Sequence, residues 1–401
     1  MGFAACAGRE AAKPMQRLQL RAFGSPTGPR SAEPFVSTGP DGAILLSWLE
    51  RQPDSSTVIL KVATADSAGR WSSPSPVVSG TDLFVNWADF PSVVALADGR
   101  LLAHWLQTNG GGKYAYDVKL AQSVDGGSSW TPVGTPHSAG LAAEHGFVTL
   151  LPRADSSADL VFLHGTPAAA GAAAGHGPPM SLAAAHWSRE NGVATGATIL
   201  DPRTCDCCQT AAASTSQGPV VIYRDRSDTE IRDMSVIRSV NGAWTAPTPL
   251  HADGWQVNGC PVNGPAVSAI GDTLAAVWFT GARDTAKVQL AFSTDAGATF
   301  GAPIRIDGGM PSGRLDVEQL RNGDALVTWI ERTGTDASEI RARLVRRDGT
   351  QEAPLTIAAL PNGRATGFPR MTRRGDDVIL AWTEPGPLST VHLALLTIGR
   401  R

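Results

Sequence analysis

The chain has 401 residues, only 18% of them charged, and its formal net charge at pH 7 is −3. With no basic stripe and no recognition motif, this charge balance gives no reason to expect a nucleic-acid partner. No apolar run is long enough to cross a bilayer as a helix, and stretches with a helical period are hard to find among the 43 glycines and 28 prolines.

The N-terminus carries a short segment, Phe3-Ala-Ala-Cys6, similar to the end of a bacterial lipoprotein signal, in which the cysteine is acylated after cleavage. The basic and hydrophobic regions that normally precede such a site are absent. Two interpretations stay open, a truncated signal or a chance match. On the first, the protein is exported and tethered to an envelope membrane only through a lipid on Cys6. We assign residues 1–14 to this segment and residues 15–401 to the folded domain.

A unit that recurs roughly every 50 to 60 residues organises the rest of the chain. In each unit one apolar run ends in an aromatic residue, usually tryptophan, and in the third unit His164 takes this place. Such a period indicates a repeat architecture, so we expect a single domain although a chain of this length usually forms two or three. The seven runs are 43–48, 101–105, 159–164, 220–223, 274–278, 325–329 and 378–382.

The pattern around these runs predicts four short strands per unit. Each run follows a small turn suited to a tight hairpin, such as Asp98-Gly99 or Asn322-Gly323. Another apolar run precedes each turn, a third follows each aromatic residue, and a weaker fourth follows in most units. Four antiparallel strands repeated seven times describe a β-propeller. We expect residues 16–22 to supply the fourth strand of the last unit and close the ring; six blades is the alternative, if the weak third unit is an insertion.

Two units share a sharper motif between their third and fourth strands. The segments SVDGGSSW (123–130) and STDAGATF (293–300) match the Asp-box pattern Ser-x-Asp-x-Gly-x-Thr-Trp. In this turn the aspartate can accept backbone N–H groups, the glycine permits a positive φ, and the aromatic residue anchors the hairpin. The residues in question are Asp125, Gly127, Trp130, Asp295, Gly297 and Phe300.

On these motifs the chain resembles the Asp-box (BNR-repeat) propellers, which include the sialidases and several non-enzymatic families. The resemblance implies that the boxes are structural and lie on the face away from the active site. It indicates a fold rather than a reaction, because such folds host many functions.

Four of the five cysteines fall in two short segments, TCDCCQT (204–210) and NGCPVNGP (258–265). Each segment lies just before the first strand of a unit, the fourth and the fifth. Because adjacent blades place these entry points side by side near the central channel, we expect four neighbouring sulfurs, those of Cys205, Cys207, Cys208 and Cys260.

Three interpretations of this cluster stay open. In an oxidising compartment nearby thiols form disulfides, here Cys205 or Cys207 with Cys260, while a vicinal Cys207–Cys208 bond would be strained. A redox-active or nucleophilic thiol is the second interpretation. The third is a metal site for one zinc or copper ion, because soft thiolates bind both. The additional metal ligands on offer are Asp206, His145 and His176.

Charged and polar side chains should converge on the same face. Residues 223–233 alternate closely in charge, and we expect their arginines to face a small anion, oriented by Asp225, Glu230 and Asp233. The alternative is that these charges pair across neighbouring blades. The predicted ligand-binding residues are Arg224, Asp225, Arg226, Arg232, Asp233, Asn263, Arg314 and Arg370.

The sialidase chemistry that the resemblance implies is incomplete in this sequence. Sialidases grip a carboxylate with three arginines and use an aspartate as acid/base and a tyrosine nucleophile assisted by a glutamate. The position of their Arg-Ile-Pro motif reads Ala-Glu-Pro here (32–34), and no tyrosine follows Tyr223. A glycoside hydrolase of this type would need other residues, and Asp89 and Glu230 are the candidate carboxylates.

The sequence therefore predicts an exported, monomeric β-propeller that binds a metal ion or a small anionic or glycan ligand at a Cys-rich, Arg/Asp-lined face. The alternatives are an exo-sialidase-like glycoside hydrolase acting at that face and an assembly factor that docks a protein there.

Overall fold

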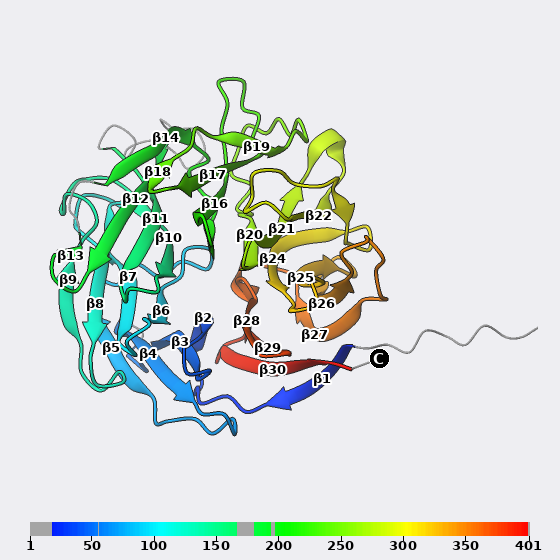
Figure 1. Ribbon diagram of the computed structural model, residues 1–401. Coiled ribbons are helices and arrows are strands. Elements are labelled where there is room, and N and C mark those ends of the chain that lie inside the picture. The colour runs from blue at the N-terminus through cyan, green and yellow to red at the C-terminus, as the bar shows by residue number, and fades with distance from the viewer. Residues whose placement is uncertain (1–17, 55, 167–179, 194–196, 400–401) are drawn as a thin grey trace, which may run out of the picture.

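The chain folds into a ring of β-sheets around a central axis (Figure 1). The structure is a computed structural model and describes residues 18–54, 56–166, 180–193 and 197–399. Within these ranges there are 30 strands in seven antiparallel sheets, and the helical segments are two short 3-10 turns, η1 (Ala282–Asp284) and η2 (Arg364–Thr366). The predicted seven-bladed β-propeller is confirmed, and the six-bladed alternative is wrong.

Blades 1 to 4 follow one another along the chain. Blades 3 and 4 have a split outer edge, because two short strands pair with the same third strand. The strands are β2 (Ser31–Thr38), β3 (Ile44–Arg51), β4 (Val58–Ala65) and β5 (Ser75–Gly80) in blade 1; β6 (Ser92–Ala95), β7 (Leu101–Thr108), β8 (Tyr116–Ser123) and β9 (Thr131–Gly134) in blade 2; β10 (His145–Pro152), β11 (Ala158–His164), β12 (Met180–Ser188), β13 (Gly192–Val193) and β14 (Thr198–Thr204) in blade 3; and β15 (Ala211–Thr215), β16 (Gly218–Arg224), β17 (Met234–Val240), β18 (Ala243–Trp244) and β19 (Thr248–His251) in blade 4.

Blades 5 to 7 complete the ring. Their strands are β20 (Ala266–Ile270), β21 (Thr273–Thr280), β22 (Lys287–Ser293) and β23 (Ile304–Arg305) in blade 5; β24 (Pro311–Gln319), β25 (Ala325–Arg332), β26 (Ala337–Val345) and β27 (Leu355–Pro361) in blade 6; and β28 (Arg370–Arg374), β29 (Asp377–Glu384) and β30 (Thr390–Ile398) in blade 7.

The N-terminal strand β1 (Leu18–Phe23) supplies the fourth strand of blade 7. It pairs antiparallel with β30, from Leu18 opposite Ile398 to Phe23 opposite Leu393, and Figure 1 shows the blue first strand beside the red last one. The ring is thus closed as predicted, although residues 16 and 17 of the predicted strand lie outside the described residues. Pairing the two ends of the chain removes an exposed sheet edge from blade 7.

The second strand of each blade forms the core between blades. These strands read as nearly continuous apolar runs because each is packed on both faces by neighbouring blades. The aromatic residues that mark the repeat lie here, and the side chains of Trp48, Trp278 and Trp329 are 0% exposed. Trp48 of blade 1 packs in one cluster with Ile379 and Ala381 of blade 7. Full burial of one such ring contributes about 2–3 kcal/mol, so the repeated aromatic position holds adjacent blades together.

Bulges distort several strands at the central axis. In β2, β10 and β24 the register shifts, and the bulged segments hold Glu33, Phe147 and Arg314 at φ values of 50°, 54° and 50°. A positive φ is uncommon for residues other than glycine and is associated with strain at functional sites. The bulges occur at one end of the strands, the end at which the candidate site lies.

The segments 123–130 and 293–300 form two matching turns. In the first, Asp125 Oδ1 accepts hydrogen bonds from the Ser123 hydroxyl (2.8 Å) and the Ser129 amide (2.9 Å). In the second, Asp295 Oδ1 accepts the same two bonds, at the same distances, from Ser293 and Thr299. The central glycines of both turns adopt a positive φ.

None of the helical segments that the structure describes has the length and apolar character of a membrane span.

Candidate functional site

The structure brings the four cysteines of the two segments together between blades 4 and 5. Cys205 Sγ lies 3.7 Å from Cys207 Sγ and 3.6 Å from Cys208 Sγ. Cys260 joins them from the loop that leads into blade 5. None of these four described cysteines forms a disulfide.

The ligand atoms form two overlapping groups. The sulfurs of Cys205, Cys207 and Cys208 all lie within 4.8 Å of one another, and so do Cys207 Sγ, Cys260 Sγ and a carboxylate oxygen of Asp206. Cys207 belongs to both groups. We call the first the inner group, because Cys205 and Cys208 are buried, and the second the outer group, because its members are half-buried.

Two buried guanidinium groups surround the inner group. Arg232 is 0% exposed and its Nη1 lies 3.3 Å from Cys205 Sγ and 3.4 Å from Asp206 Oδ1. Arg224 is 2% exposed and donates only to backbone carbonyls, those of Asn263, Arg232 and Phe279. Within the described residues no carboxylate pairs with Arg224, so its positive charge acts on the sulfurs.

The local electrostatics shift the pKa values of the cysteines in opposite directions. Burial raises the pKa of Cys205, but the thiols of Cys207 and Cys208 and the cations Arg232 and Arg224 outweigh burial and hold that pKa well below its usual value. The pKa of Cys207 is raised by its contacts with the other three thiols, and the pKa of Cys208 is raised by burial and by Cys205. Of the cysteines in the inner group, Cys205 is therefore the one whose thiolate form the surroundings favour.

The outer group opens into a cavity of about 170 Å³. Glu144 also lines this cavity, and the Tyr116 hydroxyl donates to its Oε1 at 2.6 Å. Burial raises the pKa of Glu144 to about 7, with a smaller contribution from Asp206 and an opposing one from Tyr116. The rest of the wall is mainly aromatic or basic, with Trp87, Tyr114 and Arg364.

Asp89, a predicted catalytic carboxylate, does not line this cavity. Its side chain is 2% exposed, its Oδ1 accepts a hydrogen bond from the amide of Phe147 at 2.8 Å, and it borders a separate void of about 40 Å³. Burial raises its pKa well above the usual value. Asp89 thus links the entry segment of blade 2 to the first strand of blade 3 through the amide of Phe147.

The charged segment 223–233 is braced internally. Glu230 accepts from Arg226 at 2.9 Å and from Arg232 at 2.8 Å, and both guanidinium groups are buried. Asp225 accepts from the Arg226 amide, and Asp233 accepts from the amides of the 254–255 loop. These two ion pairs lie within the segment rather than across neighbouring blades, and Arg224, Arg226 and Arg232 are not among the residues that line the cavity.

Three more of the predicted ligand-binding residues come from blades 5, 6 and 7: Asn263, Arg314 and Arg370. Asn263 contacts the cysteine cluster, because its amide donates to Cys208 Sγ at 3.4 Å. The Arg314 guanidinium stacks on Trp87 at 4.6 Å and donates to Gly363 O at 2.6 Å, while its amide donates to Asn263 Oδ1 at 2.8 Å. Burial lowers the pKa of Arg314 to about 10, and the nearby Arg364 adds to this. Arg370 Nε lies 3.4 Å from Asp316 Oδ2.

His145 lies away from the cysteines. Its ring stacks on His137 at 3.8 Å and on His164 at 4.8 Å inside blade 3, and it belongs to neither ligand group among the described residues. Burial lowers its pKa to about 3, with contributions from His137 and His164. The other predicted histidine ligand, His176, lies outside the described residues.

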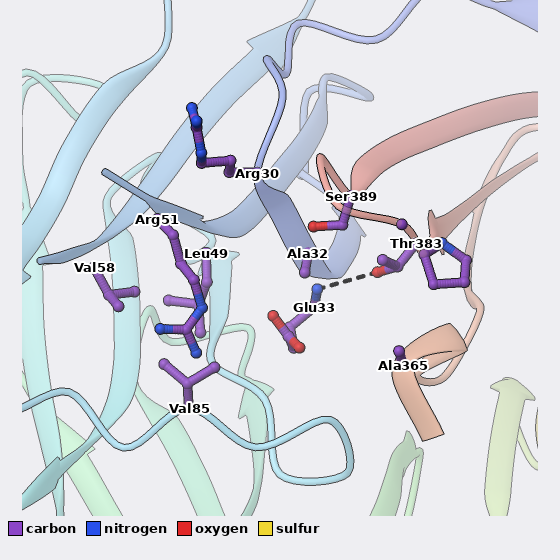
Figure 2. A pocket seen from close by; sticks show the side chains of 12 residues that line it. Arg30, Ala32, Glu33, Leu49, Arg51, Val58, Val85, Ala365, Thr383 and Ser389 are labelled. Atoms are coloured by element: carbon purple, nitrogen blue, oxygen red, sulfur yellow. Dashed lines mark hydrogen bonds between the residues drawn. The ribbon is translucent and has the colours of Figure 1, made fainter. Parts of the chain in front are cut away.

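A second cavity, of about 200 Å³, lies between blades 1 and 7 (Figure 2). Figure 2 shows the carboxylate of Glu33 pointing into it, with Arg51 on the facing wall and Thr383 accepting the Glu33 amide at 3.2 Å. Burial raises the pKa of Glu33 to about 7, and Arg51 opposes this. The sequence marks this position only by a charged residue next to a proline, Glu33-Pro34, at the place of the sialidase Arg-Ile-Pro motif. The Tyr116–Glu144 pair was missed for lack of any local motif.

No family model matches this sequence, and no match was found among curated proteins. Three solved structures share its architecture. A protein of unknown function from Dyadobacter fermentans DSM 18053 aligns with a TM-score of 0.54 and 14% identity over 96% of this chain and 100% of that one. The polysaccharide lyase Uly1 gives 0.53 and 9% over 92% and 90%, and the Hadza microbial sialidase Hz136 gives 0.50 and 13% over 85% and 73%. At these identities the likeness shows the propeller fold alone.

Proposed function

We propose that the protein binds a soft, thiophilic metal ion, copper(I), at the sulfurs of the inner group. The observation that carries this proposal is the position of Cys205, Cys207 and Cys208, whose sulfurs all lie within 4.8 Å of one another. Thiolates are the ligands that soft ions select.

Copper(I) fits the inner group better than zinc does. Structural zinc sites are almost always four-coordinate and tetrahedral, whereas this group offers three sulfurs. Among the described residues no histidine belongs to either group, so nitrogen ligands do not complete a zinc site. Zinc with an open position in the outer group is the alternative metal.

Metal thiolates also match the surrounding charge better than disulfides do. A disulfide is neutral, and it would leave the buried Arg224 without a compensating anion among the described residues. A buried unpaired cation is costly. Thiolates coordinated to a monovalent ion keep a net negative charge beside Arg224 and Arg232, and so support the metal-binding interpretation.

The test is metal retention by a Cys6→Ser variant, in which the four clustered cysteines are the only thiols. The reduced protein is loaded anaerobically with copper(I), passed over a desalting column and analysed for copper and protein. We expect stoichiometric copper retention that falls by about one equivalent in a Cys205→Ser/Cys208→Ser double variant. Retention of no copper by a fully reduced and folded protein would overturn the proposal.

Three further points belong to the same proposal. The chain is exported and monomeric, with Cys6 as the point of lipid attachment to an envelope membrane. The matching turns at 123–130 and 293–300 are Asp-boxes, and the protein is a distant Asp-box propeller related to the sialidase-like superfamily. The hydrogen bonds of Asp125 and Asp295 support this assignment.

A glycan is the second candidate ligand, and one observation favours it. The Tyr116–Glu144 hydrogen bond of 2.6 Å ends at the cavity, where a carboxyl group with a pKa of about 7 is suited to proton transfer. The Uly1 lyase and the Hz136 sialidase, which share the fold, are named as glycan-processing enzymes. In a glycoside hydrolase the carboxylates would then be Glu144 and Asp206 rather than Asp89 and Glu230. Hydrolysis of anionic oligosaccharides that is abolished by Glu144→Gln would support this function over metal binding.

A further inference from the structure

We infer that the site holds two copper(I) ions bridged by the sulfur of Cys207, an inference that rests on the proposed function. One ion occupies the inner group and the other binds Cys207 and Cys260 in the outer group, beside Asp206.

The two overlapping ligand groups are the first line of evidence. Each contains at least two sulfurs within 4.8 Å of one another, and Cys207 is the one member they share. The groups otherwise use different residues, with Cys205 and Cys208 on one side of Cys207 and Cys260 and Asp206 on the other. A thiolate sulfur has more than one lone pair and can bind two soft cations, so a shared sulfur between two ligand sets is a bridging position.

Burial distinguishes the two positions. Cys205 and Cys208 are 1% and 2% exposed, whereas Cys207 and Cys260 line the 170 Å³ cavity with Asp206. An ion in the inner group is therefore less accessible to solvent than one in the outer group. The outer position is the entry point, open to exchange with solvent or with a small thiol ligand, and the inner position is the protected one.

The local charge supports occupancy by more than one ion. Among the described residues, the guanidinium groups of Arg224, Arg226 and Arg232 lie around the cluster, and Glu230 pairs with the last two. Arg232 contacts one member of each ligand group, Cys205 and Asp206. Four thiolates and Asp206 would still outweigh this positive surplus, and a second monovalent cation brings the buried site closer to neutrality than one ion does.

The test counts ions in matched serine variants on the Cys6→Ser background. Anaerobic copper(I) loading is followed by copper and protein analysis and by X-ray absorption at the copper edge. Because each group would bind its own ion, we expect about two equivalents in the parent and about one in Cys260→Ser. The X-ray absorption data should show copper–copper scattering in the parent and none in that variant. Cys208→Ser, at a buried position, should also retain about one equivalent of copper, in the outer group. We expect this ion to exchange quickly with an added chelator, whereas the ion left in Cys260→Ser should exchange slowly.

The possible results separate the inference from the proposed function. One equivalent in the parent, unaffected by Cys260→Ser, overturns the two-ion site and leaves copper binding intact. Two equivalents without copper–copper scattering overturn the Cys207 bridge. No copper in any folded variant overturns both. If Cys208→Ser does not fold, Asp206→Asn, which keeps the side-chain shape, serves as the second variant. We expect it to keep both ions and to speed release of the outer one, and loss of the inner ion alone would contradict the assignment.

Discussion

The backbone amide of Phe147 in blade 3 donates a 2.8 Å hydrogen bond to Oδ1 of Asp89, which lies just before the first strand of blade 2. The same kind of bond recurs around the ring, from an inner-strand amide to a side chain of the preceding blade. The others join Gly264 to Gln209 (3.0 Å), Arg314 to Asn263 (2.8 Å), Met371 to Asp316 (2.7 Å) and Glu33 to Thr383 (3.2 Å). These bonds satisfy amides that the bulges and entry loops leave without a strand partner.

Asp89 should therefore matter for stability through its acceptor oxygen rather than through its charge. We expect Asp89→Ala to lower the free energy of unfolding by about 1–3 kcal/mol, because a buried amide loses its acceptor. Asp89→Asn keeps an oxygen acceptor and should stay within about 1 kcal/mol of the parent. Urea unfolding at neutral pH measures both. Equal losses in the two variants would show that the carboxyl group acts as a charge.

Glu318, half-buried on β24, should make stability fall as pH rises. Burial, with a contribution from Asp316, raises its pKa from 4.5 to about 8. The folded state therefore binds more protons than the unfolded state between these values, so this contribution is complete below pH 4.5 and is lost as pH rises through 8. The slope from one group is at most about 1.4 kcal/mol per pH unit.

The variant that tests this is Glu318→Gln. It should flatten the decline of unfolding free energy between pH 5 and 8, while the exposed control Glu190→Gln should not change the profile. Parallel profiles for the parent and Glu318→Gln would contradict the assignment.

His145 should act in the opposite sense, at acid pH. Both ring nitrogens are buried and find no hydrogen-bond partner in the part of the chain that the structure describes, and burial lowers the pKa from 6.5 to about 3. The unfolded state binds the extra proton, so this contribution is complete above pH 6.5 and is lost as pH falls toward 3. His145→Phe keeps a ring against His137 and cannot be protonated. We expect it to retain stability at pH 7 and to unfold less readily than the parent at pH 5.

A matched control for His145 exists in blade 7. His392 stacks on Trp382 at 5.7 Å with its side chain 42% exposed. His392→Phe should leave the acid part of the stability profile unchanged, as measured by thermal unfolding at a series of pH values. An equal gain in both variants would mean that added apolar surface, rather than protonation, is responsible.

The sequence was sufficient for features that repeat or that follow from topology. An aromatic residue recurs in six of the seven units because this position packs between blades, so the sequence favoured seven blades and left six open only through His164 of the third unit. The proximity of Cys207 to Cys260 followed because the entry loops of adjacent blades must lie side by side.

Features that depend on side-chain direction were harder to predict. The alternating charges of 223–233 suggested an anion site, yet Arg232 and Glu230 form an ion pair within this segment. Their backbone groups bond to the segment 255–257, which leads into blade 5. The hydrogen bond from the bulged Phe147 amide to Asp89 could not be predicted, because sequence alone does not show which groups a buried carboxylate faces. The Glu33 cavity depends on a bulge and on a contact between the first and last blades, and neither leaves a local pattern.

Closure of the ring by the first strand gives the last prediction. Leu18 and Leu20 are both on β1, the outer strand of blade 7. Leu18 is 4% exposed and packs with residues of blades 6 and 7, whereas Leu20 is 40% exposed. Leu18→Ala should cost about 2–5 kcal/mol because it opens a cavity in that cluster. Leu20→Ala should change the free energy of unfolding by less than about 0.5 kcal/mol. Both variants keep the pairing with β30, so a large difference between them in urea unfolding shows that β1 holds the ring through packing as well as hydrogen bonds. If neither change affects stability, blade 7 does not depend on its N-terminal strand.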